Sequence, residues 1–190
     1  RDVIGIAPTG SGKTVAFGIP ALTMINETRR MSNTVTHGCA TPRVLILCPT
    51  RELVQQTTKV MRAMGGGAVK VDHAFGGQDR DMQRGWMERG DVDVLVAAPG
   101  RLCDFVESGT VKLDEVDFLV FDEADRMLEM GFAPQISFIM GAMNTKENEE
   151  KKKERVTMMW SATWHSKVQS LSRDYLGTNP LKIIVGAAKD

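Results

Sequence analysis

A segment near the start of the chain combines a glycine-bearing turn with a lysine and a threonine. It follows the apolar run Val3–Ile6 and precedes a segment with helical spacing. In a strand-turn-helix unit of this kind, backbone N–H groups and the positive end of the helix dipole face a phosphate. The lysine can reach the outer phosphates of a nucleotide, and the threonine hydroxyl can bind Mg²⁺. The alternative is a glycine turn that only caps a helix. The predicted nucleotide-binding residues are Thr9, Gly10, Ser11, Gly12, Lys13 and Thr14.

A pair of acidic residues supplies the second element that nucleotide chemistry requires. Asp122 and Glu123 directly follow the apolar run Phe118–Phe121. At a strand end near the phosphate loop, Asp122 would hold Mg²⁺ directly or through water. Glu123 could orient and deprotonate the water that attacks the γ-phosphate. The alternative is that the pair only begins a helix, where acidic residues are favoured by the dipole.

The elements that must position these residues alternate between strand and helix. We expect strands at Val3–Ile6, Val44–Cys48, Val69–Phe75, Val92–Ala97, Phe118–Phe121, Val156–Trp160 and Leu181–Val185. We expect helices at about 12–31, 51–64, 79–89, 100–108, 123–130, 133–143 and 165–176. Several strands are apolar on consecutive residues, which is typical of strands covered on both faces. The pattern predicts an α/β domain with a mainly parallel sheet between two layers of helices.

Two polar stretches interrupt this alternation. Residues 28–43 predict an exposed loop. Residues 144–155 carry a run of Lys and Glu that indicates a solvated connector, with a phosphate-binding patch as the alternative.

Composition limits the classes of partner. The 190 residues are 42% hydrophobic and 25% charged, which is typical of one ordinary globular domain. Lys plus Arg equals Asp plus Glu at 24 each, so any contact with nucleic acid must be local. No apolar run approaches the roughly 18 residues of a membrane span, and no signal peptide is recognisable. We therefore expect an intracellular protein, in the nucleus or the cytoplasm, without membrane contact.

Six short motifs along the chain, in order, resemble those of the DEAD-box ATP-dependent RNA helicases. Asp122-Glu123-Ala124-Asp125 spells the name of that family, and Ala7 to Thr14 resembles its first motif. The other four are Pro49-Thr50-Arg51-Glu52-Leu53, Gly76-Gly77, Ala98-Pro99-Gly100-Arg101 and Ser161-Ala162-Thr163. Trp164, directly after the last motif, further resembles the p68/Dbp2-like branch.

The resemblance implies a fold, cofactors and a set of contacts. It implies a RecA-like P-loop domain that uses ATP and Mg²⁺ and holds RNA by its sugar-phosphate backbone, without reading sequence. The implied RNA contacts are Thr50, Arg51, Gly77, Pro99, Gly100 and Arg101. Ala98 stands where the family usually has Thr, so one hydroxyl contact is missing. Each RNA motif can also be interpreted as an ordinary helix start or turn.

The resemblance also implies how the activity is organised. Asp125, Ser161 and Thr163 would couple hydrolysis to RNA engagement, whereas a Ser-Ala-Thr segment can also simply cap a helix. Residues 1–190 would form the first RecA-like domain, with the upstream glutamine motif and the second RecA-like domain of the parent outside this chain. The function implied for the parent is ATP-dependent RNA duplex unwinding, with an ATP-gated RNA clamp as the alternative. In the family, the second domain brings an arginine finger to the γ-phosphate, and such a residue can be worth about 10³ to 10⁵ in rate. The isolated chain is therefore expected to be nearly inactive.

Overall fold

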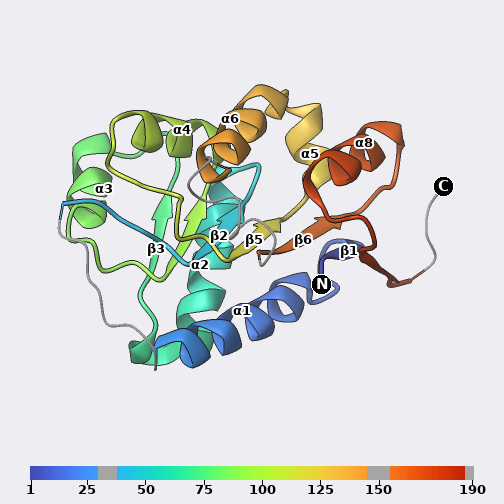
Figure 1. Cartoon of the computed structure of the whole chain (residues 1–190), viewed down its shortest axis with the longest axis horizontal. Helices are drawn as coiled ribbons and strands as arrows, with labels where there is room; N and C mark the ends of the chain where they lie inside the picture. Colours follow the sequence, from blue (N-terminus) through green and yellow to red (C-terminus); the bar gives the residue numbers. More distant parts are fainter. Residues whose placement is uncertain (30–37, 145–154, 187–190) are drawn as a thin grey trace.

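Seven parallel strands form one continuous sheet in the computed structural model (Figure 1), which describes residues 1–29, 38–144 and 155–186. The strand order is β3-β4-β2-β5-β6-β1-β7. The strands are β1 (Val3–Ile6), β2 (Val44–Leu47), β3 (Val71–Ala74), β4 (Val94–Ala97), β5 (Phe118–Phe121), β6 (Val156–Ser161) and β7 (Leu181–Ile184). Every pairing between them is parallel, so the described sheet is wholly rather than mainly parallel.

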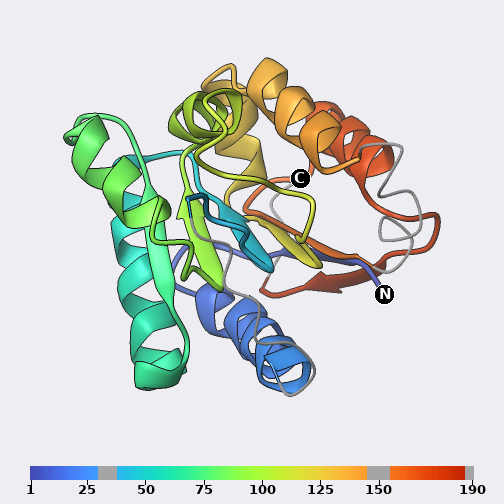
Figure 2. The same cartoon turned by 60° about the vertical axis from the view of Figure 1, so that its left-hand side comes forward.

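Helices cover both faces of this sheet (Figures 1 and 2). Helices α1 and α2 lie on one face, helices α4, α5, α6 and α8 lie on the other, and α3 flanks the β3 edge. Their bounds are α1 (Lys13–Arg29), α2 (Arg51–Gly65), α3 (Arg80–Met87), α4 (Pro99–Glu107), α5 (Ala124–Glu129), α6 (Ala133–Met143) and α8 (Ser166–Tyr175). A short 3₁₀ turn, Gly66–Ala68, follows α2.

The central strand β2 shows why the apolar runs are continuous. Its four residues are completely buried and alternate between the two faces. Val44 and Ile46 belong to the core beneath α1 and α2, whereas Leu45 and Leu47 belong to the core beneath α4 and α6. Successive side chains of a strand point to opposite faces, so a strand covered on both sides must be apolar throughout.

One aromatic side chain of β6 lies directly over a glycine of the neighbouring strand β1. Gly5 is paired in register with Trp160, whose indole ring lies over the glycine. A Cβ atom built on Gly5 would come within 2.2 Å of the ring. The same ring packs against Phe17 of α1, with 6.5 Å between ring centroids. The absence of a side chain at Gly5 therefore allows the tryptophan to close the core beside the phosphate loop.

The predicted elements are confirmed, with small shifts at their ends. The strands expected at Val69–Phe75 and Val92–Ala97 are each shorter at the start. The predicted loop at 28–43 begins within α1, which extends to Arg29, and its residues 30–37 lie outside the described part. Of the connector predicted at 144–155, residues 145–154 also lie outside it. Among the described residues, no helix is both long and apolar enough to span a bilayer.

Candidate active site

The phosphate loop and the acidic pair emerge from one edge of the sheet. Strands β5, β6 and β1 are neighbours in that order, and all three run in the same direction. Ile6 at the end of β1 is in register with Ser161 at the end of β6, and the N–H of Ala7 donates to the carbonyl of Ser161 at 3.0 Å. Segments that leave the carboxyl ends of adjacent parallel strands share a crevice where ligands bind.

The turn before α1 requires glycine at two positions. Gly10 and Gly12 have φ angles of 77° and 87°, which side-chain-bearing residues rarely adopt. Lys13 begins α1 and is only 8% exposed. Its Nζ donates to the carbonyl of Ala7 at 3.1 Å and to that of Pro8 at 3.4 Å. The ammonium is therefore buried with oxygen partners from its own loop.

Asp122 lies across from this lysine in a largely buried position. It is 2% exposed, and its N–H donates to the carbonyl of Leu47 on β2 at 2.9 Å. Its Oδ1 atom is buried and has no hydrogen-bond partner among the described residues. A buried carboxylate oxygen without a partner is costly and indicates a ligand or ion that satisfies it.

Asp122 and the phosphate loop line the same cavity, whose volume is about 420 Å³. Its lining comes from the phosphate loop, the start of α2 and the acidic segment after β5. The lining residues are Thr9, Gly10, Gly12, Lys13, Thr14, Thr50, Glu52, Leu53, Gln56, Asp122, Glu123 and Arg126. The structure thus brings together most residues of the predicted nucleotide site, and Ser11 lies on the same turn, where its Oγ donates to the carbonyl of Pro8.

These residues fit a metal-bound triphosphate. Carboxylate and hydroxyl oxygens are the ligands that Mg²⁺ prefers. The unpartnered Oδ1 of Asp122 and the hydroxyl-bearing Thr14 line the cavity, together with the cationic Lys13. A cavity that combines one buried cation with a buried carboxylate suits an anion and its counter-ion together.

The environment raises the pKa of Asp122 from 3.8 to about 6. Loss of hydration on burial is the main cause, and the negative charge of Glu123 adds to it. The positive charge of Lys13 acts in the opposite direction but does not cancel the effect. Without a bound cation, the ionised carboxylate is thus an unfavourable group in the folded protein.

We expect Asp122→Asn to stabilise the protein at neutral pH in the absence of nucleotide and Mg²⁺. The pKa of Asp122 is higher in the folded than in the unfolded protein, so ionisation of this residue destabilises the fold. This effect is absent below pH 4, develops between about pH 4 and 6, and persists at higher pH. A shift of this size corresponds to roughly 3 kcal/mol. Melting temperatures of both proteins measured from pH 4 to 8 should therefore diverge as pH rises. A difference that does not change with pH would contradict the raised pKa.

Glu123 has a left-handed backbone conformation, which the sequence did not predict. Its φ of 57° and ψ of 55° are left-handed, and it is the one non-glycine residue with positive φ in the described ranges. Its Oε2 lies 3.4 Å from the Nη1 of Arg126, one turn further along α5. The left-handed residue turns the chain sharply between β5 and α5, which leaves both carboxylates of the pair on the cavity lining.

The segment after β6 contacts the acidic segment through one residue of the predicted coupling set. Both the N–H and the Oγ1 of Thr163 donate to the Oδ2 of Asp125, at 3.0 and 2.9 Å. Ser161, another residue of that set, has a buried Oγ without a hydrogen-bond partner in the described part of the chain. It is completely buried at the end of β6, and its carbonyl accepts the hydrogen bond from Ala7 described above.

The predicted RNA contacts gather at the carboxyl ends of β2, β3 and β4. Thr50 caps α2 by accepting the N–H of Leu53 at 3.3 Å. The Nη1 of Arg51 donates to the carbonyl of Gly77 at 3.2 Å. Gly77 has a φ of 78° and is exposed. Two predicted RNA motifs, far apart in sequence, are therefore in direct contact.

The third RNA motif joins the same group from α4. Pro99 is the first residue of this helix and is buried, whereas Gly100 and Arg101 are partly exposed. The guanidinium of Arg101 reaches the carbonyl of Gln78, with Nη1 and Nη2 at 3.5 and 3.4 Å, and lies 5.6 Å from the ring centroid of Phe105. A helix start with an arginine in its first turn suits a phosphate group.

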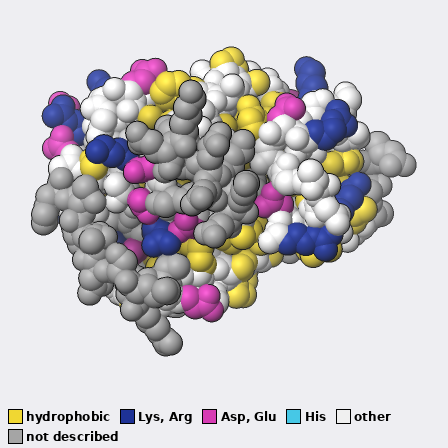
Figure 3. Space-filling model, viewed as in Figure 1, with side chains coloured by type: hydrophobic (Ala, Val, Ile, Leu, Met, Phe, Trp, Pro, Cys, Tyr) yellow, Lys and Arg dark blue, Asp and Glu magenta, His cyan; other side chains and the backbone are white. Residues whose placement is uncertain are grey.

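Charged side chains elsewhere do not form a single basic surface on the visible face. Figure 3 shows lysine and arginine side chains in separate patches, several of them beside acidic side chains. This arrangement agrees with equal numbers of basic and acidic residues in the whole chain. The equal charge totals therefore give no overall basic field that would attract an anionic partner.

Several residues of the site were missed by sequence reasoning. Arg126, Glu52 and Gln56 line the cavity, and Gln83 bonds the backbone beneath the Gly76-Gly77 turn. Arg126 could have been found from its spacing of three residues after Glu123 on a helix. Glu52 lies within a motif singled out above, but without an assigned role. Nothing in the sequence marked Gln56 or Gln83, because their positions depend on the packing of separate elements.

A protein-family model described as DEAD/DEAH box helicase matches residues 1–171. The chain belongs to this family. It is 40% identical over 188 residues to DEAD-box ATP-dependent RNA helicase 5 of Oryza sativa subsp. japonica, covering 98% of this chain and 34% of that protein. It is 42% identical over 193 residues to ATP-dependent RNA helicase DBP2 of Eremothecium gossypii, covering 98% and 31%. The chain thus spans about a third of the length of these relatives.

Solved structures of DEAD-box proteins have the same fold. The crystal structure of the yeast DEAD-box splicing factor Prp28 matches with a TM-score of 0.82 and 32% identity, covering 100% of this chain and 42% of that one. A hypothetical ATP-dependent RNA helicase from Sulfolobus tokodaii matches with a TM-score of 0.77 and 31% identity, covering 97% and 48%. The predicted RecA-like fold is confirmed, and the relative named DBP2 agrees with the branch suggested by Trp164.

Proposed function

We propose that this domain binds Mg-ATP in the cavity beneath the phosphate loop and holds RNA along the ends of β2, β3 and β4. In the whole protein, ATP hydrolysis in this cavity would drive local separation of RNA duplexes. RNA and ATP are both intracellular, so the activity belongs in the nucleus or the cytoplasm. The proposal rests chiefly on one observation: Lys13, Thr14 and Asp122, whose Oδ1 has no hydrogen-bond partner among the described residues, line one cavity together.

Each residue of the cavity has a distinct task in this proposal. Lys13 exchanges its loop carbonyls for the outer phosphates, and Thr14 and Asp122 hold Mg²⁺. The cation would neutralise charge that develops on the phosphates. Glu123 accepts a proton from the attacking water, which converts it into a better nucleophile. The glycine turn supplies backbone N–H groups to the phosphates.

The surface formed by the predicted RNA contacts at the ends of β2, β3 and β4, here called the RNA face, would hold an RNA strand through its phosphates. Its members are Thr50, Arg51, Gly77, Pro99, Gly100 and Arg101. Arg51 and Arg101 each keep N–H donors that their contacts with Gly77 and Gln78 do not use, because a guanidinium carries five. Contacts of this kind position a strand and carry no sequence information. The contact between Thr163 and Asp125 would link the cavity to the conformational change that accompanies RNA binding.

The whole protein would need more than the residues of this domain. We propose that residues 1–190 form the first RecA-like domain, and that a second RecA-like domain of the same protein completes both sites. The domain alone would then bind nucleotide weakly and hydrolyse it very slowly. The similar proteins reported above carry the name of helicases, and no contact among the described residues favours the alternative of an RNA clamp.

Removal of the two arginines tests the RNA part of the proposal. In the full-length protein, Arg51→Ala and Arg101→Ala should each raise the RNA concentration needed for half-maximal ATPase by about 10- to 100-fold, the effect of a lost hydrogen bond to a charged group. The ATP affinity measured without RNA should not change, because neither arginine lines the nucleotide cavity. ATPase rates measured over a range of single-stranded RNA concentrations give the comparison.

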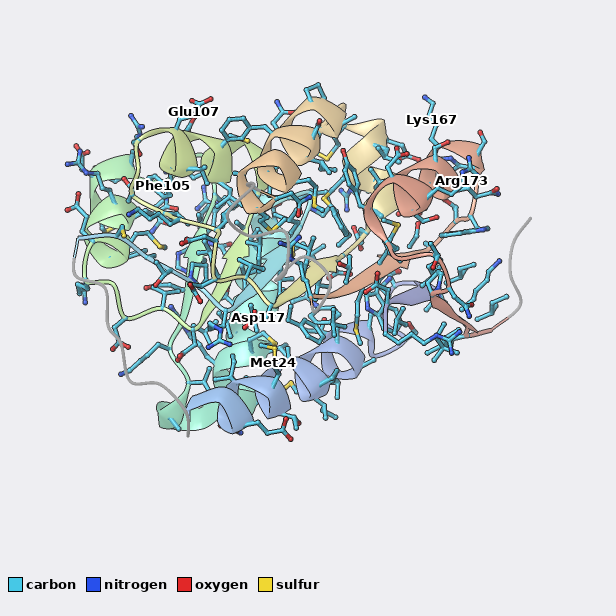
Figure 4. The ribbon with its side chains drawn as sticks, viewed as in Figure 1. Met24, Phe105, Glu107, Asp117, Lys167 and Arg173 are labelled. Carbon is cyan, nitrogen blue, oxygen red and sulfur yellow. The ribbon has the colours of Figure 1, made fainter. Side chains whose placement is uncertain are left out.

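Arg173→Ala is the matched control for this experiment. Arg173 is an exposed arginine on α8, and Figure 4 shows it on the opposite side of the molecule from Phe105, the residue beneath Arg101. It should leave RNA stimulation unchanged. If the variants of Arg51 and Arg101 also kept full RNA stimulation, these two arginines would not bind RNA. The domain would then be a P-loop ATPase without an RNA-binding site at the ends of β2, β3 and β4.

A further inference from the structure

One short turn orients both arginines of the RNA face. Residues 75–79 connect β3 to α3, and the carbonyls of Gly77 and Gln78 accept hydrogen bonds from Arg51 and Arg101, respectively. The arginines come from α2 and α4, which lie on opposite faces of the sheet. Their common partner is the turn, so its position sets the direction of both guanidinium groups.

A buried amide holds this turn in place. Gln83, on α3, has no exposed surface. Its Oε1 accepts the N–H of Phe75 at 3.0 Å, and its Nε2 donates to the carbonyl of Phe75 at 3.0 Å and to that of Asp79 at 3.4 Å. Strand β3 is at the edge of the sheet, and Phe75 directly follows it. The glutamine therefore bonds to Phe75 much as a neighbouring strand would.

The ring of Phe75 extends this support to one arginine directly. The guanidinium of Arg51 lies 5.4 Å from the ring centroid of Phe75, within the range of a cation–π contact. The same ring also stacks with the imidazole of His73, at a centroid distance of 5.0 Å. Gln83 thus fixes the backbone of a residue whose side chain also supports Arg51.

We propose that Gln83 is a positioning residue for RNA binding, which acts by holding the 75–79 turn so that Arg51 and Arg101 point toward the sugar-phosphate backbone. The inference rests on the proposed RNA function of those arginines. Gln83 itself is buried and touches no RNA. Without its amide, the turn would lose three hydrogen bonds, and part of the RNA-binding energy would be spent on ordering the turn again.

The experiment measures RNA affinity in the full-length protein. Gln83→Met keeps the length of the side chain but removes its hydrogen bonds. The dissociation constant for a fluorescein-labelled poly(U) strand is measured by anisotropy, with a non-hydrolysable ATP analogue present. It should rise about tenfold, which corresponds to the net free energy of one to two hydrogen bonds. The ATPase rate at saturating RNA and the half-saturating ATP concentration should stay unchanged.

Two further variants separate positioning from general destabilisation. Ile25→Val removes a methyl group from the core beneath α1 and should lower the melting temperature without weakening RNA binding. Gln83→Asn keeps the amide group on a side chain that is one methylene shorter, so its RNA affinity should lie between those of the wild type and Gln83→Met. It also serves if the methionine variant does not fold.

A double-mutant cycle decides between the outcomes. If Gln83 acts through the arginines, Gln83→Met should weaken RNA binding in the wild type but not in a protein that already carries Arg51→Ala and Arg101→Ala. An equal loss in both backgrounds, or no loss in either, would overturn the role of Gln83 and leave the proposed function intact. If the arginine variants alone bound RNA normally, the proposed RNA function would be wrong, and the role of Gln83 with it.

Discussion

Glu123→Gln should lower the RNA-stimulated ATPase rate of the full-length protein by about 10²- to 10⁴-fold, the usual contribution of a general base. The amide has the same size as the carboxylate and can adopt the same left-handed backbone, but it cannot accept a proton from water. Binding of ATP should persist, because Lys13 and the glycine turn are unaffected. Steady-state ATPase assays and titration with a fluorescent ATP analogue give the two quantities.

Glu129→Gln is the control for the change of charge. Glu129 is exposed and ends α5, the same helix that Glu123 precedes, and it does not line the nucleotide cavity. Its variant should hydrolyse ATP at the normal rate. Ordinary turnover in Glu123→Gln would dismiss this residue as the base and require another acceptor in the cavity.

Lys13→Ala should weaken the binding of Mg-ATP by about 100-fold, because a hydrogen bond to a charged group contributes roughly 1.5–3 kcal/mol. The substitution also leaves the carbonyl of Ala7 without its partner. The loss should appear in the dissociation constant of a fluorescent ATP analogue measured with Mg²⁺. RNA binding without nucleotide should be much less affected, since Lys13 lies outside the RNA face.

Lys59→Ala provides the comparison, because it removes an equal charge from an exposed position on α2. Its nucleotide affinity should match that of the wild type. If Lys13→Ala bound ATP as tightly as Lys59→Ala, the ammonium would remain with its loop carbonyls in the bound state, contrary to the proposed exchange.

The fold was predictable because its signals are local. Val44, Leu45, Ile46 and Leu47 are consecutive apolar residues, and that pattern alone indicates a strand buried on both faces. The phosphate loop was equally clear, since its chemistry lies within eight consecutive residues. The meeting of this loop with Asp122 followed from the parallel direction of the strands, which places their carboxyl ends at one edge.

The remaining features depend on contacts that no local pattern encodes. The left-handed conformation of Glu123 forms the sharp turn between β5 and α5, and residues other than glycine adopt it rarely. The hydrogen bonds of Gln83 join residues eight positions apart across a turn whose shape the sequence does not specify. Ser161 belongs to the predicted coupling set, yet nothing in the sequence indicated that its buried hydroxyl would have no hydrogen-bond partner among the described residues.

The contact between Gly5 and Trp160 restricts how this domain can change over generations. A Cβ atom at position 5 would lie 2.2 Å from the indole, so no larger residue is tolerated while the tryptophan remains. A smaller residue at 160 would have to come first, at the cost of a void beside Phe17. The two positions are therefore expected to vary together among descendants of this sequence, with the order of the exchanges fixed by size.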